Sequence, residues 1–136
     1  MPVWGRLRSL SELFASLETA VVASTYCNSW LFPALDSQRP LESMARAYSE
    51  IFIVRSEGYK EMVLAEACRH YRAEGILFHE ARTCPPNSNT RFGLPERLQR
   101  AWGLPTLVLD GDLNDLRCFS DEQARTNIET FVELLR

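Results

Sequence analysis

Apolar residues recur at helical spacing in three parts of the chain, and this periodicity predicts amphipathic helices. The first helix carries its apolar side chains at i, i+3, i+7 and i+10, on Leu7, Leu10, Phe14 and Leu17. Two further stripes of this kind are made by Leu64, Ala67, Cys68 and Tyr71, and by Ala124, Ile128, Phe131, Val132 and Leu135. We expect all three stripes to face a core.

Helix-breaking and capping residues place the ends of other helices. A helix is predicted over residues 40–50, because a proline opens it, and another over residues 94–102, where Gly103 closes it. Ser120, followed three residues later by Gln123, resembles a capping box at the start of the last helix.

Three short runs of consecutive apolar and β-branched residues predict strands buried on both faces. They are Thr19–Thr25, Ile76–Phe78 and Thr106–Leu109. Gly75, directly before the second run, suits the left-handed residue that follows a helix. The run Ile51–Val54 fits either a fourth strand or the end of a helix, and helix is favoured because no turn residue precedes it.

The alternation of helices with such strands predicts a parallel sheet sandwiched by helices. The expected fold class is α/β: a small three-layer, Rossmann- or flavodoxin-like domain with a mostly parallel sheet of about three or four strands. A chain of 136 residues is long enough for one domain with an ordinary core, so residues 1–136 are expected to form a single α/β domain.

The composition argues against several classes of function. The chain is 46% apolar and 24% charged with a net charge of −3, so it has the profile of a globular domain without a basic footprint for nucleic acid. It shows no secretion signal and no run of about 18 apolar residues, so no membrane partner is expected and the cytoplasm is the predicted location. Lys60 is the only lysine, a bias that by itself has no functional weight.

Polar loops follow the predicted strands, and in an open parallel sheet ligands bind beyond the carboxyl ends of the strands. Three loops leave those ends: Tyr26–Asn28, His79–Arg91 and Asp110–Asp112. In the second loop Cys84 could be a metal ligand or an incidental thiol. Arg82 and Arg91 on either side of it would favour the thiolate.

The other polar residues of these loops also have plain structural interpretations. His79 can bond to the backbone at a strand end. Asp110 and Asp112 resemble a cation-binding pair, although Asp-Gly-Asp after a strand is also ordinary turn chemistry. The backbone of an irregular loop can be satisfied by Asn87, Ser88 and Asn89.

The cysteines do not settle the question by their spacing. Cys27, Cys68, Cys84 and Cys118 form no C-x-x-C pair, so the usual zinc-ribbon and thioredoxin spacings are absent. Cys68 lies on a core-facing stripe, where packing is the simpler role. Nucleotide-binding and serine-hydrolase fingerprints are absent as well. Spacing alone therefore leaves the function open.

A more specific signal comes from two segments, GILFHEARTCPPNSNTRFGLPERL and GLPTLVLDGDLNDLRCFSDEQARTNIETFVELL. They contain an apolar strand, a polar loop with one cysteine, a helix, Gly-Leu-Pro before a second strand, an acidic loop, and a final helix with Arg125, Ile128, Glu129 and Phe131. In this order they resemble the carboxy-terminal part of a 2-hydroxyacyl-CoA dehydratase subunit. That family includes the 2-hydroxyglutaryl-CoA dehydratase D-component and ATP-dependent benzoyl-CoA reductase subunits. The resemblance covers roughly residues 60–136, and more loosely the whole chain.

The resemblance implies a cofactor, a reaction and partners. Family subunits hold an iron–sulfur cluster through three cysteines, and Cys84 matches the one in the loop after the apolar strand. The expected cofactor is a [4Fe-4S] cluster, shared or incomplete in this chain. The expected reaction removes water from an (R)-2-hydroxyacyl-CoA through a ketyl radical, with an electron from an ATP-dependent iron–sulfur activator protein. Hydrogen bonds and positive charge in the acyl-CoA pocket would come from His79, Arg82, Asn87, Asn89 and Arg91.

The chain also departs from the family, because a family subunit is several times longer and its other cluster cysteines lie in earlier segments. The missing amino-terminal part or a second dehydratase subunit would then complete the site. The alternative is a non-catalytic α/β assembly module with no cluster of its own. A third hypothesis is a mononuclear metal site made by His79, Cys84 and an acidic residue of Asp110–Asp112. The acyl group, and the choice between dehydration and ring reduction, are not predicted.

Overall fold

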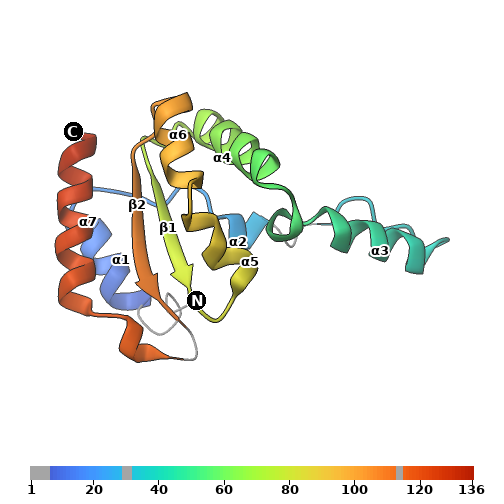
Figure 1. Ribbon diagram of the computed structural model, residues 1–136, viewed down its shortest axis with the longest axis horizontal. Helices are drawn as coiled ribbons and strands as arrows, with labels where there is room; N and C mark the ends of the chain where they lie inside the picture. Colours follow the sequence, from blue (N-terminus) through green and yellow to red (C-terminus); the bar gives the residue numbers. More distant parts are fainter. Residues whose placement is uncertain (1–6, 29–31, 113–114) are drawn as a thin grey trace.

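The computed structural model describes residues 7–28, 32–112 and 115–136. It consists of helices around a small sheet (Figure 1). In chain order the elements are α1 (Leu7–Ser16), α2 (Thr25–Asn28), α3 (Pro40–Glu50), η2 (Phe52–Val54), α4 (Glu57–Tyr71), β1 (Ile76–Ala81), α5 (Pro85–Ser88), η3 (Asn89–Arg91), α6 (Leu94–Trp102), β2 (Thr106–Gly111), η4 (Leu116–Cys118) and α7 (Asp121–Leu135).

The sheet is parallel and lies between two layers of helices, so the α/β fold class is confirmed. β1 pairs with β2 from Ile76 opposite Thr106 to Ala81 opposite Gly111. Figure 1 shows α1 and α7 on one side of the two strands and α4 and α6 on the other. Both strands run longer than the predicted segments and carry Glu80 and Asp110 to the carboxyl end of the sheet.

Alternation along each strand divides the apolar side chains between two cores. On one face the buried side chains of Leu13, Leu109, Ile128 and Val132 join α1, β2 and α7. On the other face those of Leu64, Ala65, Leu94 and Leu98 join α4 and α6, with Ile76 and Phe78 of β1 packed against them. The two predicted stripes of α4 and α7 thus cover opposite faces of one sheet.

The predicted helix ends hold, with one exception. The α6 helix ends at Gly103, whose φ of 64° is left-handed, and the Ser120 hydroxyl caps α7 by accepting a bond from the Gln123 N–H at 3.3 Å. Gly75, in contrast, is not the helix-ending residue, because α4 ends at Arg72 with φ 53°. Glycine is needed at Gly75 for close packing, since a Cβ there would lie 2.7 Å from a ring carbon of Phe131.

The strand predicted over Thr19–Thr25 is wrong. Residues 19–24 adopt neither helix nor strand, and Thr25 begins the short helix α2. The apolar side chains meant for a core are in water, with Val21 68% and Val22 50% exposed. Among the described residues the sheet has two strands, and this segment pairs with neither of them.

The predictions for residues 40–54 are confirmed in part. The helix over residues 40–50 is α3, which projects away from the sheet in Figure 1 and buries none of its residues. Ile51 leaves that helix in an extended conformation, and Phe52–Val54 forms a single 3-10 turn. Neither a strand nor a continuation of the helix is therefore present there. Within the described parts of the chain, we find no helix long and apolar enough to span a lipid bilayer.

Candidate functional site

The loop after β1 contains Cys84, and its backbone is closed by hydrogen bonds on both sides of the cysteine. The Cys84 N–H donates to the Ala81 carbonyl at 2.8 Å, and the Cys84 carbonyl accepts from the N–H groups of Asn87 and Ser88 at 2.9 Å each. The residue itself is half-buried and precedes the first turn of α5. The structure thus places this thiol in an ordered turn at the carboxyl end of the sheet, as the sequence predicts.

Asp112 ties the loop after β2 to the loop after β1. Its carboxylate accepts the Thr83 backbone N–H at 2.6 Å and the Thr83 hydroxyl at 2.9 Å. Asp110, two residues earlier, is exposed and instead pairs with Arg82 at 3.1 Å. The two aspartates that resembled a cation-binding pair therefore serve separate partners.

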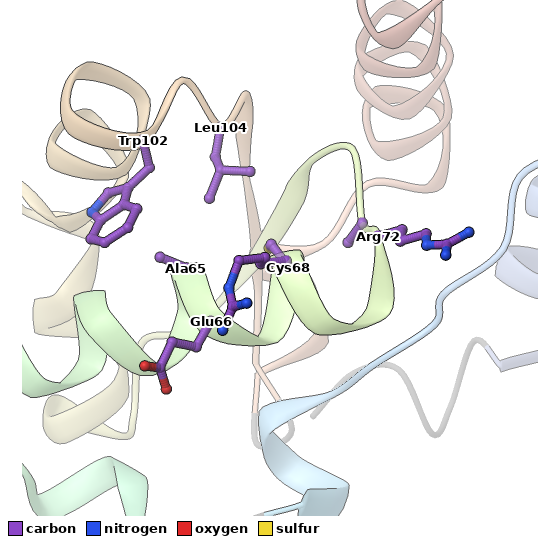
Figure 2. Close-up of a pocket in the computed structure, with 8 residues that line it drawn as sticks. Ala65, Glu66, Cys68, Arg72, Trp102 and Leu104 are labelled. Atoms are coloured by element: carbon purple, nitrogen blue, oxygen red, sulfur yellow. The ribbon is translucent and has the colours of Figure 1, made fainter.

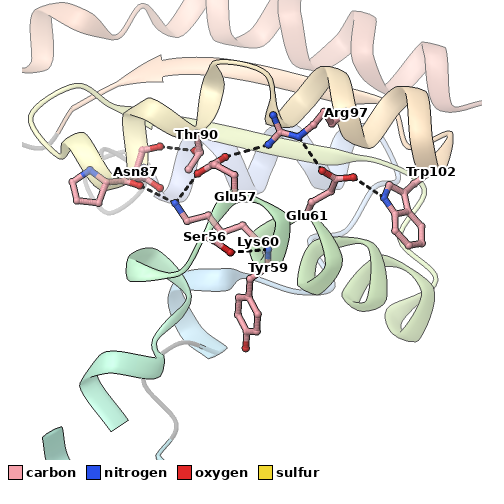
Figure 3. Close-up of polar contacts among 10 residues, drawn as sticks. Ser56, Glu57, Tyr59, Lys60, Glu61, Asn87, Thr90, Arg97 and Trp102 are labelled. Carbon is pink, nitrogen blue, oxygen red and sulfur yellow. Dashed lines mark hydrogen bonds and ion pairs between the residues drawn. The ribbon is translucent and has the colours of Figure 1, made fainter. Parts of the chain in front are cut away.

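Lys60 ties the same loop to helix α4 from the other side. Figure 3 shows its ammonium group between Glu57 and the short helix α5. The ammonium donates to Glu57 Oε1 at 3.0 Å and to the Pro86 carbonyl at 3.4 Å. The Asn87 side chain donates to the His79 carbonyl at 3.1 Å, which fastens α5 to β1 as well.

The two arginines of the loop face acidic residues of the same chain. Arg91 pairs with Glu80, and Arg82 pairs with Asp110, the residue opposite Glu80 in the sheet. The pKa of Asp110 is held below its ordinary value, first by a hydrogen bond with Glu80 and then by Arg82 and Arg91. Each arginine is thus already paired with a carboxylate at the carboxyl end of the sheet. This pairing weakens the electrostatic stabilisation that the arginines can give to the Cys84 thiolate or to a bound anion.

His79 does not converge with these residues. Successive strand residues point to opposite faces, so the His79 ring lies on the α1–α7 side while Glu80 and its arginine lie on the other. Burial lowers the pKa of His79, and the nearby Asp112 carboxylate opposes that shift. Its Nε2 atom is buried and has no hydrogen-bond partner among the residues that the structure describes. Burial thus favours the neutral form of this ring.

The cysteines do not gather into a ligand set. Cys27 is exposed, Cys68 is buried on the core face of α4, and Cys84 and Cys118 are half-buried in different loops. In residues 7–28, 32–112 and 115–136, no three side chains of His, Cys, Asp or Glu lie close enough to hold one metal ion. The mononuclear site of His79, Cys84 and an acidic residue is therefore wrong. For a cluster, the described residues provide the thiol of Cys84 but not a complete set of ligands.

A cavity of about 370 Å³ lies at the opposite end of the sheet. Figure 2 shows that it is lined by Cys68 and Arg72 at the end of α4, by Trp102 at the end of α6 and by Leu104 after that helix. Arg72 and Leu104 precede β1 and β2, so the cavity is near the amino ends of the strands and away from Cys84. The sequence did not predict this cavity, because the residues that line it were interpreted as core positions or helix ends.

Sequence reasoning also missed Lys60, Glu57 and Glu80. Lys60 contacts the loop after β1, Glu80 pairs with Arg91 of that loop, and Glu57 pairs with Lys60. These residues lie on a helix and within a strand rather than in a loop. The sequence pointed to Lys60 only in that it is the single lysine of the chain, and the structure buries its side chain. Asn89, also among the predicted binding residues, is exposed.

Known proteins with a similar sequence are subunits of acyl-CoA enzymes. Lactoyl-CoA dehydratase subunit alpha of Anaerotignum propionicum is 27% identical over 133 residues, which are 98% of this chain and 32% of that protein. The (R)-2-hydroxyisocaproyl-CoA dehydratase alpha subunit of Clostridioides difficile is 28% identical over 140 residues, covering 99% of this chain and 33% of that protein. One of the benzoyl-CoA reductase subunits of Thauera aromatica is 22% identical over 138 residues, with coverages of 98% and 32%.

The similarity extends over the amino-terminal residues as well as the two segments that first suggested it. The chain spans about a third of the length of these relatives. The pattern of the family described as "2-hydroxyglutaryl-CoA dehydratase, D-component" matches residues 1–135. This protein chain therefore belongs to the 2-hydroxyglutaryl-CoA dehydratase D-component family.

Proposed function

We propose that the chain is the carboxy-terminal subdomain of an iron–sulfur-dependent (R)-2-hydroxyacyl-CoA dehydratase or benzoyl-CoA-reductase-like enzyme. In this proposal Cys84 provides one thiolate to a [4Fe-4S] cluster. The observation that carries it is the place of Cys84, in an ordered turn at the carboxyl end of β1, in a chain of this family. Thiolates are the protein ligands that iron–sulfur clusters favour.

The remaining ligands of the cluster would come from outside the described residues of this chain. Since the chain corresponds to about a third of its relatives, the rest of a longer protein or a second dehydratase subunit can supply them. When bound, the cluster would supply one-electron chemistry for the removal of water from the acyl-CoA thioester, with the electron from an ATP-dependent iron–sulfur activator. Solvent exclusion and hydrogen bonds around the sulfur atoms would set the reduction potential.

The other predicted binding residues would then have different roles. Arg82, Arg91 and Asn89 lie at the open side of the loop and could meet the acyl-CoA, but both arginines would have to exchange their carboxylate partners for it. Asn87 supports the loop through the His79 carbonyl rather than facing a ligand. His79 would act as a neutral hydrogen-bonding group, because burial lowers its pKa.

Anaerobic reconstitution with iron and sulfide tests this proposal. The chain and its Cys84→Ser variant are compared with a Cys118→Ser control, which changes another half-buried cysteine. Bound iron and visible absorption that disappear in Cys84→Ser and persist in Cys118→Ser would support a cluster ligand at Cys84. Iron that persists in Cys84→Ser would contradict it. Iron absent from all three proteins would mean that this chain alone does not hold a cluster, and the same comparison would then be made with the missing part or a second subunit present; iron still absent there would favour the alternative, an α/β assembly module with no cluster of its own.

A further inference from the structure

Cys84 is flanked by two anchor points that use buried charged side chains from different elements. Thr83, directly before it, is held by Asp112 from the loop after β2, and Pro86, two residues after it, is held by Lys60 of α4. Asp112 is 0% exposed and Lys60, the only lysine in the sequence, is 4% exposed. The segment around the thiol is therefore fastened to the domain at both ends.

Packing alone does not explain these two charges. A buried carboxylate or ammonium is unfavourable unless it is paired or hydrogen-bonded, and an apolar side chain of similar volume often fills the same space at least as well. Here Asp112 directs both oxygens to Thr83, while Lys60 reaches the Pro86 carbonyl and pairs with Glu57. Both charges act on the backbone of one loop, on either side of one cysteine.

The geometry points to a positioning role: we propose that Lys60 and Asp112 fix the place of the Cys84 thiol. A ligand or reactive group must be held to within about 0.5 Å, and this needs supporting contacts behind it. The hydrogen bonds of the Cys84 backbone close the turn locally, and the two charged anchors attach that turn to α4 and to β2. The inference rests on the proposed function for the use of the thiol, but the anchoring can be measured without iron.

The test is the rate of alkylation by iodoacetamide in the full, iron-free chain under reducing conditions. Mass spectrometry follows Cys84 and Cys118 separately, so that Cys118 reports any general loosening of the fold. In Asp112→Asn and Lys60→Met we expect Cys84 to react at least about tenfold faster, because a lost bond to a buried group favours the open loop by about this factor. The Cys118 rate should stay the same.

Two milder variants keep the test decisive if a buried substitution prevents folding. Thr83→Val removes one hydroxyl at an exposed position and should raise the Cys84 rate by about threefold. Lys60→Arg keeps a donor for the Pro86 carbonyl and should restore the slow rate that Lys60→Met loses. An unchanged ratio of Cys84 to Cys118 rates in Thr83→Val, or equal acceleration at both cysteines, would overturn the proposal.

Reconstitution separates this inference from the proposed function. If alkylation of Cys84 is selectively faster in the variants but bound iron does not depend on Cys84, Cys84 is not a cluster ligand and the anchoring by Lys60 and Asp112 still stands. If bound iron depends on Cys84 but alkylation of Cys84 is not selectively faster in the variants, the anchoring is refuted and the role of Cys84 as a cluster ligand still stands.

Discussion

The packed body, residues 57–112 and 115–135, and the outer segment, residues 19–28 and 32–54, differ sharply in what their apolar residues do. In the packed body, α4, α6 and α7 bury side chains such as Leu98 and Ile128 against the two strands. In the outer segment none of the described residues is buried, and α3 exposes Leu41, Met44 and Tyr48. Similar apolar patterns thus form a core in one region and stay exposed or only half-buried in the other.

The difference shows that a short run of apolar and β-branched residues does not by itself make a buried strand. Residues 76–81 and 106–111 satisfy each other's backbone groups in a parallel ladder and are covered by helices on both faces. Residues 19–24 have comparable β-branched character but pair with neither strand, and none of them is buried. Burial in a parallel sheet is therefore a property of the assembled layers rather than of one segment.

The largest effect should come from a cavity in the packed body. Leu98→Ala removes a fully buried side chain between α4 and α6, and we expect a loss of about 2–5 kcal/mol in the free energy of unfolding. The matched change Leu41→Ala on the exposed face of α3 should stay within about 0.5 kcal/mol. Urea denaturation followed by circular dichroism measures both. Equal losses would mean that the outer segment packs as tightly as the body.

A glycine pair should give effects of opposite sign. Gly75→Ala places a methyl group 2.7 Å from Phe131, and the overpacking should destabilise the chain by about 1–3 kcal/mol. Gly58→Ala, in the first turn of α4, meets no atom within 4 Å and should stabilise the helix by about 0.4–1 kcal/mol. Thermal unfolding of both variants provides the comparison. A stabilising Gly75→Ala would contradict the close approach of α7 to the sheet.

Removal of a helix cap should have a smaller effect within the packed body. Ser120→Ala leaves the Gln123 N–H without its side-chain acceptor and should cost about 1 kcal/mol. Ser120→Asp should retain most of the stability, because its carboxylate can also accept at this position. Chemical denaturation of the two variants is the measurement, and equal losses in both would argue against the cap.

The pH dependence of stability should report on His79. The pKa of His79 is lowered by burial from its ordinary value of 6.5, so the unfolded chain binds its proton first. Stability should therefore fall as the pH falls below about 6.5 and through the lower folded pKa. The effect should be modest, since attraction to Asp112 opposes the shift. Denaturation curves from about pH 5 to about 7.5, where histidine titrates, should lose this slope in His79→Asn but not in the exposed control His70→Asn.

The smallest effect should come from the failed strand. Val22→Thr changes a half-exposed side chain outside any ladder and should alter the free energy of unfolding by less than about 0.5 kcal/mol. The same denaturation measurement on Val108→Thr provides the comparison, because Val108 lies in the middle of the paired strand β2. A loss above about 1 kcal/mol at Val22 would mean that residues 19–24 contribute to the core after all.

The sequence by itself determined the α/β class, the long helices α1, α3, α4, α6 and α7, and the position of Cys84 after a strand. These features depend on local periodicity, on capping by Ser120 and on chain breakers such as Gly103, all of which act within a few residues. The motif order around Cys84 also identified the family, which the match over residues 1–135 confirms.

The tertiary structure alone decided which polar groups meet. Alternation separates His79 from Glu80, and parallel register brings Glu80 beside Asp110 so that the two arginines are balanced there. The anchors of Cys84, Lys60 and Asp112, are 24 and 28 residues away from it in the sequence. Such contacts depend on how elements pack rather than on spacing along the chain, because a buried charge is stabilised by whichever backbone group the fold places beside it.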